Sequence, residues 1–423
     1  MPRVQLSPVL LVATMVAGCP SDPPQFGSDT DSIATTSGPD SGAGDGTGSG
    51  GGGTTNEVDI LFVIDNSGSM AEEQAAIATS AAALTASLDA AGVDYRIAVT
   101  TTDVDNPWCS GTTPEVGRPR LSSCRSRQDE FVFVGAQQID ATAEACLEIC
   151  AAETLEVLPT DVVGDIMAAP RPWIEVTAGV SNIDGLAIAD ALACALPQGI
   201  NGCGFEQPLE AMYKAIALSD FEDDQAFGFF RTGAVPVVII VSDEADCSYN
   251  PDQETIFLPD DDRFFWSLPD EPTPTSAVCW NAGVQCNGGG CTPANLDALG
   301  ADTSEANAVM RPVSRYVDTL QELEDAAAAV TPGVDLLVEV FGGFTPDGSV
   351  VYQPSADPAF QDDYGIGPGC SSSAGEAVPM VRIVAVADAM ATDGHAPLSS
   401  ICDASFDSKM AGIAQRIIGE LGG

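Results

Sequence analysis

The stretch 58–70 reads VDILFVIDNSGSM, and its order of residue types decides the fold. Its first seven positions are apolar except for Asp59, and the next five, DNSGS, are polar or glycine. A continuous rather than alternating apolar run predicts a strand buried on both faces, as in a parallel sheet covered by helices. Gly68 permits a sharp backbone after it. The stretch therefore predicts a buried strand that ends in a tight polar loop before a helix.

Similar apolar runs recur along the chain and alternate with segments of helical periodicity. Further buried strands are expected at 95–100, 235–241, 334–341 and 380–387. Apolar residues repeat at helical spacing in 70–88, 309–320 and 410–421, and the first of these segments stops at Gly92. This alternation predicts an α/β doubly wound fold, with a mainly parallel central sheet and right-handed crossovers.

The composition excludes several classes of function. The 423 residues include 15 basic and 62 acidic side chains, a formal charge of −47, and 45% are hydrophobic, which is enough for a sizeable core. Such a polyanion repels phosphate backbones, so we expect no nucleic-acid partner. His395 is the one histidine, which removes multi-histidine metal sites.

The N-terminus has the features of an export signal. Residues 1–18 contain Arg3 and a short apolar run that is too short to span a bilayer. They end in Val-Ala-Gly before Cys19, which resembles a bacterial lipobox, and an ordinary export signal is the alternative. The resemblance implies lipid on Cys19 as the membrane anchor. Residues 19–56 are rich in Gly, Ser, Thr and Asp and are expected to form a disordered tether.

The remaining residues, 57–423, are expected to form one domain with long insertions at about 103–180, 245–304 and 343–377. The chain has 13 cysteines, so lipid on Cys19 leaves twelve that can form six disulfides. We predict the pairs Cys194–Cys203 and Cys370–Cys402. Metal ligation is the competing interpretation for two further pairs of cysteines, which are Cys286 with Cys291 and Cys146 with Cys150.

The polar loop after the first strand carries the candidate chemistry. Asp65, Ser67 and Ser69 place one carboxylate and two hydroxyls at the carboxyl end of a strand, where ligands bind in open α/β sheets. Hard oxygen donors of this kind suit Mg²⁺, Mn²⁺ or Ca²⁺. The alternative is structural, because Ser67 or Ser69 can also cap the following helix.

The same residues resemble the metal-ion-dependent adhesion site (MIDAS) of von Willebrand factor type A (VWA) domains. Asp65, Ser67 and Ser69 match the opening motif of that site, and the strand and helix order resembles the family from about residue 57 to the end. The family's last ligand is an Asp after a later strand, which matches Asp243 after 235–241. Glu244 stands where the family usually has a glycine.

The resemblance implies one more ligand, and two residues compete for it. Glu206 lies five residues before Ala211 and resembles the Glu that integrin β chains use in the corresponding loop. Ser181 resembles the more usual Thr loop but lies one helix earlier. A third carboxylate favours tighter binding of the cation and makes Ca²⁺ more plausible.

In the VWA family an acidic side chain of a protein partner completes the metal coordination. The resemblance therefore implies a lipid-anchored protein of the bacterial cell envelope, at the outer membrane or cell surface, that binds a protein partner in adhesion or assembly. Two alternatives stay open: a structural protein whose metal only stabilises the fold, and a metal-dependent hydrolase. We expect no enzyme, because the chain offers no histidine partner at the site.

Overall fold

The computed structural model describes residues 55–135, 138–260, 263–373, 375–392 and 394–422. The predicted signal segment 1–18, Cys19 and the tether as far as residue 54 lie outside the described residues. All described residues belong to one compact unit of the chain.

A mixed α/β architecture with a mainly parallel central sheet confirms the predicted fold class. In the described part of the chain the central sheet has seven strands in the order β13-β10-β7-β1-β2-β5-β6. The parallel strands are β1 (Glu57–Ile64), β2 (Asp94–Thr101), β7 (Val235–Val241), β10 (Leu337–Gly342) and β13 (Leu398–Ser400). The edge hairpin β5 (Trp173–Thr177) and β6 (Val180–Ser181) begins with β5 antiparallel to β2.

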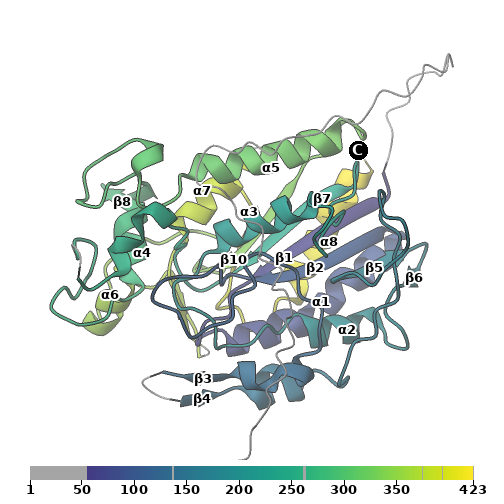
Figure 1. Cartoon of the computed structure of the whole chain (residues 1–423), viewed down its shortest axis with the longest axis horizontal. Coiled ribbons are helices and arrows are strands. Elements are labelled where there is room, and N and C mark those ends of the chain that lie inside the picture. Colours follow the sequence, from purple (N-terminus) through teal and green to yellow (C-terminus); the bar gives the residue numbers. More distant parts are fainter. Residues whose placement is uncertain (1–54, 136–137, 261–262, 374, 393, 423) are drawn as a thin grey trace, which may run out of the picture. The chain divides into compact units, whose positions relative to one another are not determined.

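Helices cover both faces of the sheet, which explains why its central strands are buried almost throughout (Figure 1). One face carries α1 (Ala71–Ala91), α2 (Ile188–Ala195) and α8 (Asp407–Leu421), and the other carries α3 (Pro208–Ser219), α5 (Val313–Ala328) and α7 (Val381–Met390). Every residue of β7 is buried, as are all of β1 after Glu57.

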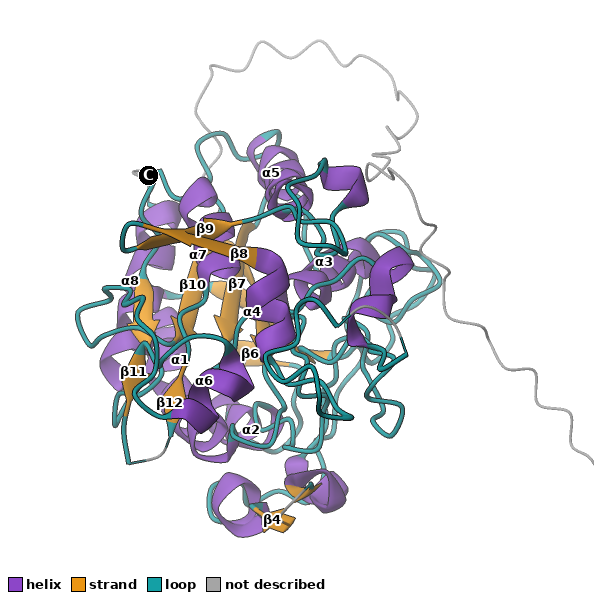
Figure 2. Ribbon diagram, turned by 90° about the vertical axis from the view of Figure 1, so that its left-hand side faces the viewer, coloured by secondary structure: helices purple, strands orange, loops and turns teal. Residues whose placement is uncertain are grey.

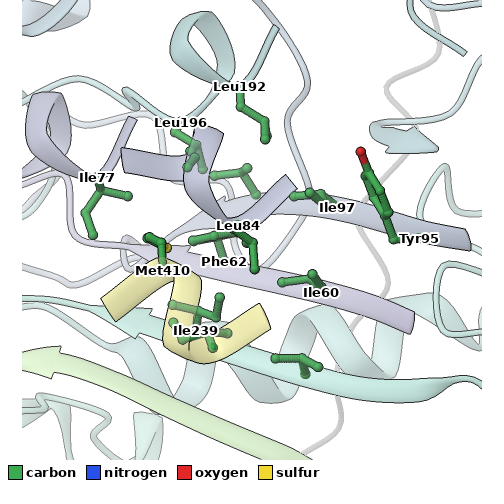
Figure 3. Close-up of a cluster of buried hydrophobic side chains, with 14 of the residues drawn as sticks. Ile60, Phe62, Ile77, Leu84, Tyr95, Ile97, Leu192, Leu196, Ile239 and Met410 are labelled. Atoms are coloured by element: carbon green, nitrogen blue, oxygen red, sulfur yellow. The ribbon is translucent and has the colours of Figure 1, made fainter. Parts of the chain in front are cut away.

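The larger core lies between the sheet and the first of these helical layers. Figure 3 shows Phe62 of β1 and Ile239 of β7 facing Leu84 of α1 and Met410 of α8, and all four are fully buried. Burial of such side chains contributes about 1.5–3 kcal/mol each. The two central strands and the loops after them are therefore held in fixed positions.

One predicted strand is wrong. Residues 380–387 lie in the helix α7 from Val381 onward, and the last strand of the sheet is β13. Buried positions Ile383, Val386 and Ala387 recur at helical spacing, although an unbroken apolar run of this length also fits a strand. β13 has only three residues, LSS, so it lacks the apolar signal of the other strands.

The insertions contain short elements of their own. Residues 103–180 include η1 (Cys124–Phe131), β3 (Val132–Val134), β4 (Gln138–Asp140) and η2 (Ala143–Leu147), and they also supply β5. The segment 245–310 forms η3 (Pro251–Phe257), α4 (Ala277–Gly283), β8 (Val284–Asn287), β9 (Gly290–Pro293) and η4 (Glu305–Asn307). Residues 343–377 form α6 (Pro358–Tyr364), β11 (Cys370–Ser371) and β12 (Glu376–Ala377).

Six disulfides hold the insertions, and all twelve cysteines after Cys19 take part. The bridges are Cys109–Cys203, Cys124–Cys146, Cys150–Cys194, Cys247–Cys279, Cys286–Cys291 and Cys370–Cys402. The predicted Cys370–Cys402 bridge is confirmed. The predicted Cys194–Cys203 bridge is wrong, because Cys194 on α2 pairs with Cys150 and Cys203 pairs with Cys109.

The disulfides also contradict the alternative of metal ligation by cysteine. Cys286 and Cys291 are bonded to each other across the β8–β9 hairpin, while Cys146 and Cys150 pair with different partners. Their sulfurs are therefore not available as thiolate ligands. Among the described residues, no helix is both long and apolar enough to cross a bilayer.

Candidate metal centre

Asp65 stands at the carboxyl end of β1 and is fully buried. Its backbone N–H donates to the carbonyl of Val241 at 2.9 Å, which continues the pairing of β1 with β7. Its carboxylate accepts from Ser67 N–H at 2.8 Å and from Ser242 Oγ at 2.6 Å. These contacts fix the carboxylate and join it to the loop after β7.

The polar loop 65–69 is held from the side of α1. Gln74 is fully buried and donates from Nε2 to the carbonyl oxygens of Asp65 at 2.7 Å and Gly199 at 2.8 Å. The helix begins after Met70 without a side-chain cap, so neither serine serves as the N-cap. Ser67 Oγ and Ser69 Oγ instead lie 3.2 Å from each other. The capping alternative is thus not realised, and both hydroxyls face one place.

Asp243 reaches the same place from the end of β7. It is 8% exposed. Burial and the charge of Asp65 raise its pKa well above the ordinary value, and a hydrogen bond from Ser69 opposes this shift. Its Oδ1 atom is buried and has no hydrogen-bond partner. The parallel register of β1 and β7 therefore brings Asp243 to Asp65 and Ser69, although Asp243 lies 178 positions after Asp65 in the sequence.

Glu206 lies beside these residues, on the segment before α3. Thr102, the residue after β2, donates its hydroxyl proton to Glu206 Oε2. The other oxygen, Oε1, is buried without a hydrogen-bond partner. Burial, followed by the negative charges of Asp65 and Glu244, raises the pKa of Glu206 well above its usual value. Glu206 is thus close enough to Asp65 to feel its charge and has an oxygen free for a ligand.

Ser181, the competing residue, is placed elsewhere. It pairs with Val176, which pairs with Tyr95 near the start of β2, and Tyr95 in turn pairs with Val58. Asp65 is seven residues further along β1, about 23 Å at 3.3 Å per residue. Ser181 Oγ accepts from the Ile183 N–H at 2.9 Å, a local turn contact. The structure does not bring Ser181 to the other candidates.

Glu244 is buried next to Asp243. Burial, with the nearby charge of Asp65, raises the pKa of Glu244 to about 8, and a hydrogen bond from Ser276 opposes the shift. None of the ion pairs found among the described residues involves Asp65, Glu206, Asp243 or Glu244. Four carboxyl groups are therefore gathered in a buried place without a basic partner, and their charged forms are costly there unless a cation neutralises them.

The donor set fits a hard divalent cation. The described residues contain no group of three or more His, Cys, Asp or Glu side chains positioned to hold a metal by themselves. A cation here would thus depend on the serine hydroxyls in addition to carboxylates, and the unpartnered oxygens of Glu206 and Asp243 are suitable donors. Three residues that contact the site, Thr102, Ser242 and Gln74, were not predicted from the sequence. Thr102 could have been predicted, because it follows a buried strand at the carboxyl edge of the sheet.

The insertions surround this place at the carboxyl edge of the sheet. Phe133 of β3 covers Gly68, since a Cβ on residue 68 would lie 3.2 Å from its ring. The Val378 N–H, just after β12, donates to the carbonyl of Asp243 at 2.8 Å, and Cys109–Cys203 ties the segment before Glu206. Figure 2 views the molecule from the side on which α4, α6 and the hairpins β8–β9 and β11–β12 lie.

Comparisons with known proteins give distant structural neighbours. No protein-family model matches the chain, and no curated protein matches it. The pilus adhesin SpaC from Lactobacillus rhamnosus GG, in its open conformation, is similar at a TM-score of 0.36 and 11% identity over 86% of this chain. The chain spans only 30% of the length of SpaC.

A second solved structure is the vWF domain of the type V pili tip protein Mfa5 from Porphyromonas gingivalis. It is similar at a TM-score of 0.31 and 13% identity over 86% of this chain and 96% of that domain. Likenesses this distant carry no inference about a ligand or partner of this chain. The architecture rests on the observed strand order, and the site rests on its contacts.

The raised pKa values predict how stability depends on pH without metal. A carboxyl group whose pKa is higher in the folded than in the unfolded protein favours folding most below its unfolded pKa, and this advantage is lost as pH rises towards the folded pKa. For Glu244 that window runs from 4.5 to about 8. We expect EDTA-treated protein to melt at a lower temperature at pH 8 than at pH 5.5, and excess Mg²⁺ to reverse the loss.

Repulsion among the many acidic side chains of a chain of charge −47 also lowers the melting temperature as pH rises. A matched variant is needed to separate this general effect from that of the site. Asp65→Asn/Asp243→Asn removes two of the buried acids and keeps almost all of the surface charge. Its melting temperature in EDTA should fall less between pH 5.5 and 8 than that of the wild type. Equal slopes in a thermal-melt series would show that the site does not cause the dependence.

Proposed function

We propose that this chain is a VWA-type domain that holds Mg²⁺, or Mn²⁺ or Ca²⁺, at its carboxyl edge and uses it to bind a protein partner. The observation that carries the proposal is the meeting of buried Asp65, Ser67 and Asp243 with the exposed Ser69, in a place where no basic side chain pairs with the two carboxyl groups. Glu206 is the proposed further ligand, because its Oε1 is buried and unpartnered.

The metal would supply a local positive charge on a strongly acidic protein. An acidic side chain of a partner is repelled by a surface of charge −47, whereas a divalent cation with an open coordination position attracts it. The proposed partner contact is therefore a carboxylate that completes the metal coordination. Such an arrangement favours one docking point over a broad interface.

We also propose that the domain is attached to the bacterial envelope, at the outer membrane or cell surface, through lipid on Cys19. The lipobox-like residues before Cys19 support this, together with six disulfides, which persist in oxidising compartments. Intact-mass measurement of membrane-extracted protein should show acyl chains on Cys19 and loss of residues 1–18. A mature soluble form without lipid would contradict the anchor.

Partner capture tests the proposed function. We expect immobilised wild-type protein to retain an envelope protein from outer-envelope extracts in Mg²⁺ and to release it in EDTA. The Asp65→Ala variant should fail to retain that protein in either buffer, because its metal site is broken.

Equal retention by wild type and Asp65→Ala in both buffers would overturn metal-dependent binding. If EDTA lowered the melting temperature and left retention unchanged, the metal would only stabilise the fold. Turnover of a substrate that disappears in Glu244→Gln while capture persists would identify a hydrolase instead, with Glu244 as its base.

A further inference from the structure

The insertion between β2 and β5 contains a groove that the metal site does not use. The groove lobe, defined as residues 124–135 and 138–147, projects beyond α1 and α2 (Figure 1). It holds an open groove of about 570 Å³. The groove is lined by Gln128, Asp129, Val132, Asp140, Thr142, Ala143 and Leu147.

The groove is preformed because its walls are joined covalently. Cys124 at the start of η1 is bonded to Cys146 in η2, and Cys150–Cys194 ties the end of the lobe to α2. Phe131 is fully buried within the lobe, where its carbonyl accepts from the Ala141 N–H at 2.9 Å. Binding of a ligand therefore costs little conformational entropy in the segments that line the groove.

The lining combines apolar and acidic side chains. Val132, Ala143 and Leu147 are apolar, whereas Asp129 and Asp140 supply two exposed carboxylates that belong to no ion pair among the described residues. None of the seven lining residues is basic. The basic residues nearest in sequence to Asp129, Arg125 and Arg127, form ion pairs with other acids, Arg125 with Glu153 and Arg127 with Glu130.

The groove lies beside the candidate metal loop. Val132, which lines it, is followed by Phe133, whose ring covers Gly68 between the two serines. Further along the same hairpin, Val134 is 79% exposed and Ile139 is 42% exposed. The β3–β4 hairpin therefore carries the groove on one face and the contact with the metal loop on the other.

We propose that the groove binds a cationic, apolar-flanked segment of the protein partner, with a Lys or Arg between Asp129 and Asp140 and an apolar side chain on Leu147. Charge complementarity carries the assignment. The chain's own tether does not fit, because residues 20–95 contain no Lys or Arg. The identification of the occupant as the partner rests on the proposed function, while occupancy of the groove does not need the metal.

A labelled peptide tests the groove directly. The probe is a fluorescent peptide of alternating Lys and Leu, titrated by anisotropy in about 150 mM salt with EDTA and again with Mg²⁺. At this ionic strength charges beyond about 8 Å are largely screened, so nearby carboxylates dominate. We expect Asp129→Asn/Asp140→Asn to raise Kd roughly fivefold or more, as expected for the loss of two exposed ion pairs. Leu147→Ser should also weaken binding.

A matched variant separates the groove from diffuse attraction. Glu222→Gln/Asp223→Asn removes the same charge from two exposed residues outside the lobe and should leave Kd within about twofold of the wild type. Equal losses in both double variants, or no loss in either, would overturn the proposal. Because the peptide has no carboxylate side chain, binding in EDTA that is lost in the groove variants supports the groove even if metal-dependent capture fails.

Discussion

The structure depends on a concentration of buried carboxyl groups at the carboxyl edge of its sheet. Asp65, Glu206, Asp243 and Glu244 are each at most 8% exposed, and no basic side chain among the described residues pairs with them. Elsewhere the protein pairs several of its buried acids with a basic side chain: Asp59 pairs with Arg231, Asp246 with Arg382, and Glu339 with Arg416. The absence of such partners is therefore local to this edge, and it is the reason for proposing a divalent cation there.

The long insertions contact the residues at this carboxyl edge and hold them in place. They approach it from several segments, through Phe133 on Gly68, Val378 on Asp243 and the Cys109–Cys203 bridge before Glu206. Each contact comes from a segment that lacks a large core of its own and is held by disulfides, which compensate for limited apolar burial. Trp173, Trp266 and Trp280 are buried where these segments pack, whereas Trp108 is 36% exposed.

Sequence reasoning predicted the central layer well because its strands are apolar on both faces. The predicted strand 235–241 coincides with β7, and the loop after β1 was located from Asp65, Ser67 and Ser69 alone. It failed where the signal was ambiguous or absent. The apolar run of α7 fits a strand as well as a helix, and the three-residue strand β13 has no run at all.

Contacts between insertions were beyond prediction for a different reason. Pairing of Cys194 with Cys150 and of Cys203 with Cys109 depends on how loops fold back, which spacing along the chain does not encode. The hydrogen bond from Thr102 to Glu206 likewise joins residues 104 positions apart. Sequence left Glu206 and Ser181 as alternatives, and only the register of β5 and β6 separates Ser181 from the site.

Calorimetry with Mg²⁺, Mn²⁺ and Ca²⁺ tests whether a divalent cation binds at the end of β1. We expect binding to the wild type, loss of binding in Asp65→Ala, and wild-type affinity in Ser181→Ala. Glu206→Gln should weaken binding roughly tenfold or more, since even groups that only support a metal ligand contribute that much. Equal heats for the wild type and Asp65→Ala would contradict a metal site at the end of β1.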